Sequence, residues 1–265
     1  MIGSANQNVH PVPRKTKYLV PAVLFVTVFF PIVSSAQESG KFEEANESYR
    51  GGDYGKAAAL YEQLAGEDPR TADYHYNLGN AYVRLGKLSE AVLSFEKALL
   101  LAPRDPDIRH NLDYARGRLE YQVEDNRNWY LKAADSALSR FTQHEMNFLL
   151  LVFIFIFLLS SILFFVFKQT VFWTAPRKFI FAFVLLAALA AGFKYAQLNM
   201  IRPAIVMANE CEARYGPSTR NQVAFHVGGG IKGFILDRRE DWSRVLLMNG
   251  ESGWIMNEDM AEIRV

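Results

Sequence analysis

Apolar residues fill two long stretches in the middle of the chain, Phe148–Phe167 and Phe179–Met200. The first has about 20 residues without a charge, which is enough for an α-helix to cross the hydrocarbon core of a bilayer. The second is interrupted only by Lys194, near its end, where a long side chain reaches the membrane interface. The pattern predicts a transmembrane helical hairpin over residues 148–200. Two buried helices of a soluble core are disfavoured, because the first stretch is apolar on every face.

Charge predicts the orientation of this hairpin. The connector between the stretches carries Lys168, Arg177 and Lys178 and no acidic residue. Basic residues in short loops favour the cytoplasmic side, so the connector is expected in the cytoplasm. A hairpin returns the chain to the side from which it came. Both flanking regions are therefore expected on the extracytoplasmic side of a bacterial inner membrane.

Residues 1–36 have the pattern of a secretory signal peptide. Basic residues around Arg14 precede the apolar run Tyr18–Val33, and the small residues Ser34-Ser35-Ala36 form a cleavage site before Gln37. An uncleaved anchor is the alternative, because the apolar run is long enough nearly to span a membrane. Cleavage after Ala36 is favoured, and both alternatives export the residues that follow.

From Gly40 to about Leu119 the apolar residues have helical spacing, and the sequence repeats itself every 34 residues. The large and small residues of the second unit follow the tetratricopeptide repeat (TPR) pattern: Leu78, Gly79, Tyr82, Ala91, Phe95, Ala98 and Pro103. Residues 37–125 are therefore predicted to form an all-α TPR solenoid. It would contain two repeats and a capping helix at Asp107–Leu119, which covers the open end of the stack.

A TPR solenoid presents a concave face to peptides or partner proteins. The candidate residues for this face lie on the first helix of each unit: Asn46, Asp73, Tyr76, Asn77, Asn80 and Arg84. Asn46 and Asn77 resemble the asparagines of repeats that clamp a C-terminal carboxylate. The basic residues of such a clamp are replaced by Phe42, Asp107 and Asn111. Ordinary docking of a partner protein is therefore favoured over capture of a carboxylate.

Residues 126–147 join the repeats to the first apolar stretch. Leu131, Ala134, Leu138 and Phe141 follow each other at steps of three and four residues, which predicts an amphipathic helix. Such a helix beside a membrane segment would lie on the outer membrane surface. The alternative is a last helix that packs against the repeats, and the pattern does not separate the two.

Short alternating segments follow Arg202-Pro203 and predict a small all-β barrel over residues 203–265. Asn249-Gly250 is a strong hairpin signal. The candidate strands are Ala204–Asn209, Glu210–Arg214, Gln222–Val227, Lys232–Asp237, Trp242–Met248 and Gly253–Met256.

The segments Arg214-Tyr-Gly-Pro-Ser218, Trp242-Ser-Arg-Val245 and Gly253-Trp-Ile255 resemble bacterial SH3 (SH3b) domains. This resemblance implies an SH3-like barrel that binds peptides or cell-wall material through an aromatic groove. Tyr215 and Trp242 are the candidates for that groove, whereas Trp254 is favoured as core.

The sequence predicts no enzyme. Cys211 and His226 are the candidate catalytic pair, but nucleophilic catalysis needs a base held against the thiol and a group that orients the base. The chain has no Walker loop, no zinc-spaced Cys/His set and no dinucleotide-binding glycine turn, so no cofactor or metal is expected. A net charge of +1 gives no support for nucleic-acid binding.

The order of signal peptide, TPR pair, membrane hairpin and SH3b barrel resembles the TPR proteins of the Bacteroides aerotolerance (Bat) operons, the BatE-like family. The residues Tyr76-Asn-Leu-Gly-Asn80 and the SH3b segments contribute to this resemblance. It implies a non-enzymatic scaffold in a cell-envelope stress complex, with membrane proteins that carry von Willebrand A-type domains as partners. The alternative is a receptor for peptidoglycan peptides that uses the TPRs as a spacer.

Overall fold

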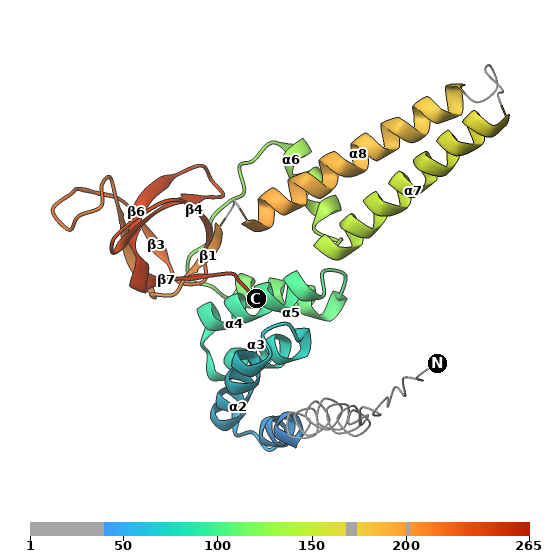
Figure 1. Ribbon diagram of the computed structural model, residues 1–265. Coiled ribbons are helices and arrows are strands. Elements are labelled where there is room, and N and C mark those ends of the chain that lie inside the picture. Colours follow the sequence, from blue (N-terminus) through green and yellow to red (C-terminus); the bar gives the residue numbers. More distant parts are fainter. Residues whose placement is uncertain (1–39, 168–173, 200–201) are drawn as a thin grey trace, which may run out of the picture.

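The computed structural model describes residues 40–167, 174–199 and 202–265. The predicted signal peptide and the basic residue Lys168 lie outside the described residues. In chain order the described parts are a stack of helices, a pair of long helices and a β-sheet. Figure 1 shows the stack and the sheet together at one end of the long helix pair.

The helical stack begins with a helix over residues 40–50 and continues with four helices, α2 (Tyr54–Glu67), α3 (Ala72–Leu85), α4 (Leu88–Leu101) and α5 (Pro106–Gly117). Local signals set their ends. Asp53 accepts a hydrogen bond from the Lys56 N–H at the start of α2, and Asp105 does the same for α5. Gly86, with φ +74°, ends α3 in the left-handed conformation that favours glycine.

Small and large residues alternate inside the stack as the 34-residue pattern predicts. A Cβ atom at Gly79 would lie 2.5 Å from the ring of Phe95, so only glycine lets α3 approach α4 this closely. Phe95 is fully buried between α3, α4 and α5. The pairing of Gly79 with Phe95 therefore sets the distance between the two helices of the second unit.

The single amphipathic helix predicted over residues 126–147 is wrong. The structure has a short helix α6 (Trp129–Leu138), a break, and then the first long helix α7 (Gln143–Phe167). Thr142 and Glu145 cause the break by forming a capping box. The Thr142 N–H donates to Glu145 Oε2 at 2.9 Å, and the Glu145 N–H donates to Thr142 Oγ1 at 3.2 Å. Helix α6 buries no residue and leaves Trp129 79% exposed, so it does not pack into the stack.

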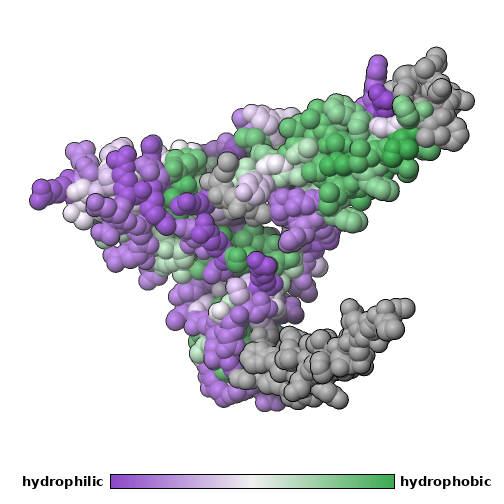
Figure 2. Space-filling view, in the orientation of Figure 1, coloured by the Kyte–Doolittle hydropathy of each residue, from purple (hydrophilic) through white to green (hydrophobic). Residues whose placement is uncertain are grey.

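Helix α7 packs along α8 (Thr174–Asn199), and together they form the hairpin. The rings of Phe153 and Phe183 stack at 5.9 Å. The spans Gln143–Leu163 and Arg177–Ala196 are long and apolar enough to cross a membrane. Most of their apolar side chains are exposed, and Figure 2 shows them as a continuous hydrophobic surface on the hairpin. Both helices begin before the starts predicted in the bounds 148–167 and 179–200, because polar turns begin the helices at Gln143 and Thr174.

The sheet module, residues 202–265, is a seven-stranded antiparallel sheet in the order β3-β2-β6-β5-β4-β1-β7. Its strands are β1 (Arg202–Val206), β2 (Glu210–Arg214), β3 (Val223–Gly228), β4 (Lys232–Arg239), β5 (Trp242–Leu247), β6 (Ser252–Met256) and β7 (Met260–Glu262). Five of these segments match the predicted strands closely. The prediction started the first strand too late and omitted β7.

The predicted turn at Asn249-Gly250 joins β5 to β6. Gly250 takes φ +92°, and its N–H donates to the Leu247 carbonyl at 3.1 Å. The Leu247 N–H donates to the Glu251 carbonyl at 2.9 Å, which closes a three-residue loop. Of the two predicted turn residues, only Gly250 has positive φ, so the loop is a turn followed by a left-handed residue rather than a two-residue turn.

The helical stack and the sheet module share a hydrophobic core. Ile205 and Ile263 of the sheet are buried with Val92, Phe95 and Ile108 of the stack. Residues 119–126 (the linker), which follow α5 in the chain, lie against the sheet. Their side chains Tyr121 and Val123 pack on the sheet core. The two modules are therefore packed against each other.

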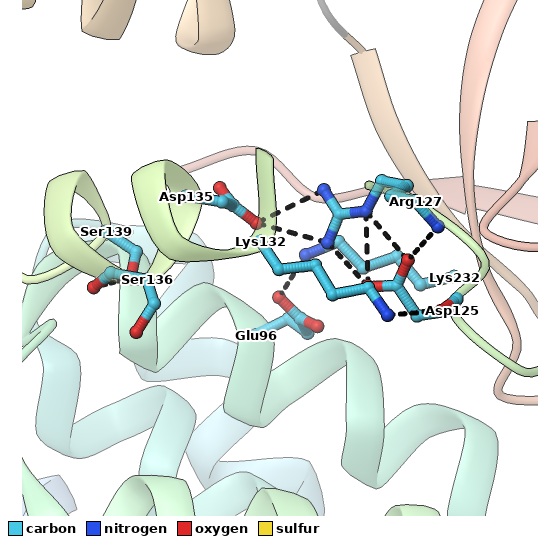
Figure 3. Close-up of polar contacts among 8 residues, drawn as sticks. All are labelled: Glu96, Asp125, Arg127, Lys132, Asp135, Ser136, Ser139 and Lys232. Carbon is cyan, nitrogen blue, oxygen red and sulfur yellow. Dashed lines mark hydrogen bonds and ion pairs between the residues drawn. The ribbon is translucent and has the colours of Figure 1, made fainter. Parts of the chain in front are cut away.

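A buried carboxylate crosses the same junction. Glu96 of α4 is 4% exposed and pairs with Arg116 of α5 and with Lys232 of β4, whose Nζ lies 2.8 Å from Glu96 Oε2 (Figure 3). Burial alone would raise the pKa of the Glu96 carboxyl. The charges of Lys232 and Arg116 outweigh burial and hold that pKa below its ordinary value. Glu96 is therefore ionised at neutral pH and links three elements of the two modules.

Candidate partner-binding site

A polar network joins helices α3 and α5 on the face that the sequence predicts as concave. The Asn111 side chain donates to Asn80 Oδ1 at 2.8 Å and to the Tyr76 hydroxyl oxygen at 3.2 Å. Tyr76 also packs on Phe95, with ring centroids 6.1 Å apart. The network therefore holds two predicted residues, Tyr76 and Asn80, in fixed orientations, and all three members remain partly accessible.

Arg84 lies one helical turn beyond Asn80 on the same face of α3. Its guanidinium group stacks over the ring of Tyr54 at 4.7 Å. Tyr54 in turn meets Tyr49 edge-on at 5.2 Å. Arg84 is exposed, so its charge faces solvent while the ring of Tyr54 holds the guanidinium group from below.

The other three predicted residues are placed apart from this network. Asn46 lies on the first helix and accepts a hydrogen bond from the Tyr61 hydroxyl at 2.7 Å, so its oxygen is already used inside the stack. Asp73 is exposed in the first turn of α3, where a negative charge suits the helix N-terminus. Asn77 is half-buried on α3 between Asp73 and Asn80.

Asn111 was not among the predicted site residues, although the sequence carries a signal for it. It lies 34 residues after Asn77 and occupies the same position of the next unit. The prediction treated α5 only as a cap because its pattern departs from the repeat after Leu112. The structure shows that α5 also contributes polar side chains to the candidate face.

The two aromatic residues predicted for a groove in the sheet module have different environments. Trp242 is 8% exposed at the start of β5 and pairs with Met256 of β6. Tyr215 follows the end of β2 and is 73% exposed. Trp254 is also buried, with Arg239 at 5.5 Å over its ring. Of the three aromatics, only Tyr215 is presented to solvent.

A pocket of ≈ 330 Å³ lies between the linker and the sheet. Tyr121, Val123 and Glu124 line it on the linker side, and His226 and Glu251 line it on the sheet side. The Tyr121 ring rests directly on Gly228, where a Cβ atom would overlap it. This part of the sheet surface is therefore covered by the chain itself.

Cys211 and His226 lie on opposite faces of the sheet. Cys211 pairs with Val227, and His226 pairs with Glu212, so side-chain alternation separates them. Burial raises the pKa of the Cys211 thiol to about 12. His226 is exposed, with Nδ1 3.4 Å from Glu210 Oε1. The histidine does not face the thiol, and the geometry provides no activated nucleophile at this position.

Residues 42–107 match the family model of the tetratricopeptide repeat. The match covers the first helix through the start of α5, the region in which the 34-residue repeat was predicted. This finding and the helical repeats support a TPR region in this chain, and TPR domains generally bind proteins or peptides. No curated protein matches the chain.

Proposed function

We propose that this chain is a non-enzymatic membrane scaffold that recruits a partner protein through the face of α3 and α5. The single observation that supports it most is the network of Asn111, Asn80 and Tyr76, which positions two predicted contact residues on a TPR stack. The network orients amide and hydroxyl groups that can hydrogen-bond a peptide backbone. No chemical step is needed for this role.

The hairpin supports membrane attachment. Its two helices have the length and the apolar, exposed surface of membrane spans. The stack and the sheet lie at the same end of it, as two crossings require. The basic residues of the connector favour a cytoplasmic turn, so both modules would lie outside the cytoplasm of a bacterial inner membrane. Resemblance to the BatE-like family adds a role in a cell-envelope stress or aerotolerance complex to this proposal.

The second candidate function is a cell-wall receptor that uses an SH3b-like groove. Burial of Trp242 and Trp254 and the covering of one surface by Tyr121 leave Tyr215 as the exposed aromatic of the predicted set. An aromatic groove needs several exposed rings, so the scaffold is favoured over the receptor. Peptidoglycan and von Willebrand A-type membrane proteins remain partners to test.

Single introduced cysteines test the placement of the modules. The native Cys211 is buried and its pKa is raised to about 12, so it contributes little background labelling. We expect Ala59→Cys and Thr219→Cys to react with a membrane-impermeant maleimide in spheroplasts, because both positions are exposed. Lys168→Cys is expected to react only after lysis. Labelling of Lys168→Cys in intact spheroplasts, or protection of the other two, would contradict the proposed topology.

Affinity purification after mild detergent extraction tests recruitment. The Tyr76→Ala/Asn80→Ala variant is expected to recover about tenfold less of the partner proteins than the wild-type chain, since buried tyrosines often dominate such interfaces. The matched control is Tyr215→Ala, which removes an exposed tyrosine from the other module. Equal recovery from the double variant and the wild type would exclude this face of the stack. Loss of the partner on Tyr215→Ala alone would favour the receptor.

A further inference from the structure

Arginine recurs at one position on the first helix of three successive units in the stack. Arg50, Arg84 and Arg118 are each 34 residues apart. They lie at the ends of the helix 40–50, of α3 and of α5. These helices begin the first, second and third units of the solenoid. Equal positions in stacked units lie side by side, so the three arginines form a row across the stack.

A second row lies one helical turn away. Asn46, Asn80 and Tyr114 precede the three arginines by four residues, which places each pair on one face of its helix. Asn80 receives the hydrogen bond from Asn111 that joins α3 to α5. The arginine row therefore borders the candidate partner-binding face.

Two of the arginines have aromatic rather than acidic partners. Arg84 stacks on Tyr54, and Arg118 stacks on Tyr114 at 5.5 Å and donates to its hydroxyl at 2.6 Å. Within the described residues, neither guanidinium group has a carboxylate within salt-bridge distance. Arg50 pairs with the exposed Glu43 at 2.5 Å. An arginine held over a ring still presents N–H donors at its edge, arranged to bind a carboxylate in two places.

We propose that the arginine row binds an acidic, extended segment of a partner protein. This proposal rests on the proposed function and adds the chemistry of the partner. The first helices of successive units lie side by side, as the Asn111–Asn80 hydrogen bond between α5 and α3 shows, and helices in contact pack about 8–10 Å apart. An extended chain advances about 3.3 Å per residue. Acidic side chains at every third residue therefore match the spacing of the arginines. In the polar row beside them, the amide oxygens of Asn46 and Asn80 already accept hydrogen bonds inside the stack, so their amide N–H groups are the donors left for the backbone of the same segment.

A synthetic peptide tests this directly with the full chain in detergent micelles. The probe is a fluorescein-labelled 12-residue peptide with glutamate at every third position, and its match has glutamine at those positions. Fluorescence anisotropy is expected to show at least about tenfold tighter binding of the glutamate peptide, since two or three exposed ion pairs contribute. The difference in affinity between the two peptides should shrink when the salt concentration rises from about 50 to about 200 mM, because salt screens exposed charges.

Charge-neutral variants assign the contact. Arg84→Gln and Arg118→Gln are each expected to weaken binding of the glutamate peptide about fivefold. Arg70→Gln is the matched control, because Arg70 is equally exposed but lies in the turn between α2 and α3. Circular dichroism should show unchanged helix content in all three variants.

Four results would overturn the proposal. They are failure of the glutamate peptide to bind, equal binding of the glutamine peptide, equal effects of Arg70→Gln, and equally tight binding of a single-stranded oligonucleotide. The last would show a general anion surface. The Tyr76→Ala/Asn80→Ala variant can lose its partner while the arginine variants bind the glutamate peptide as tightly as the wild type. In that case the scaffold function stands and the acidic partner does not. If the arginine variants bind the peptide more weakly while the Tyr76→Ala/Asn80→Ala variant keeps its partner, the acidic ligand stands and recruitment through Tyr76 and Asn80 does not.

Discussion

Removal of both cations around Glu96 is expected to destabilise the protein by about 3–5 kcal/mol at pH 7, the cost of leaving a buried carboxylate without its partners. The variant is Arg116→Met/Lys232→Met. Both side chains contact the Glu96 carboxylate, which is 5% exposed at the junction of stack and sheet. Urea unfolding of the detergent-solubilised full chain, followed by tryptophan fluorescence, measures the change.

A third substitution separates charge from packing. Adding Glu96→Leu to the two methionines is expected to recover most of the lost stability, because an apolar trio avoids desolvating any charge. The single variant Arg104→Met is the control, since Arg104 forms a more exposed pair with Glu145 at 2.5 Å. A double variant as stable as the wild type would show that the junction does not depend on this ion triad.

The pH dependence of the two forms should have opposite signs. In the wild type the folded pKa of Glu96 lies below its unfolded value, so the triad stabilises the fold above about pH 4.3. This contribution is lost as the pH falls through the folded pKa. In the double methionine variant, burial without cations raises the folded pKa, so stability falls as the pH rises above about 4.3.

Substitution of Gly228 by valine is expected to loosen the linker from the sheet module and to cost about 1–3 kcal/mol, as overpacking of a close contact does. A Cβ atom at Gly228 would overlap the ring of Tyr121, so the ring would have to move away from the sheet core on which it packs. Limited proteolysis should then cut residues 119–126 at least about tenfold faster than in the wild type, since cleavage follows the population of the opened segment.

The matched control is Gly66→Ala in α2, where a Cβ atom meets nothing within 4 Å. That change replaces glycine by alanine inside a helix and should raise stability by about 0.5–1 kcal/mol. Unchanged proteolysis of the linker in Gly228→Val would show that the linker is held by other contacts. Asn126 would then be the next candidate, because its N–H donates to the Met248 carbonyl at 3.2 Å.

Local and periodic sequence signals predicted most of the secondary structure of this protein. The 34-residue repeat, the apolar stretches and the alternating strands each depend on residues close in sequence, and the structure has helices and strands in those places. The family match over residues 42–107 supports the repeat independently. Tyr76 and Asn80 could be selected for the same reason, since the repeat pattern predicts which helix positions face a partner.

The errors arose where two local signals competed or where a contact is distant in sequence. Helical spacing continues through residues 138–141, so the pattern hid the capping box of Thr142 and Glu145 that starts a new helix. The three residues of β7 carry too little pattern to predict, and they form a strand because they pair with β1. Trp242 was predicted as a groove residue, but it is 8% exposed in the sheet, where it pairs with Met256 and Arg239 of the two neighbouring strands.

The sequence by itself therefore determined the helical repeat, the two apolar helices and most strands, because hydrophobic periodicity and turn residues act over a few positions. The tertiary structure alone decided how these parts meet. It brought Lys232 to Glu96 across 136 positions of sequence, seated Tyr121 on Gly228, and joined Asn111 to Tyr76 and Asn80. Such contacts depend on which surfaces exclude water together, and no local pattern records that choice.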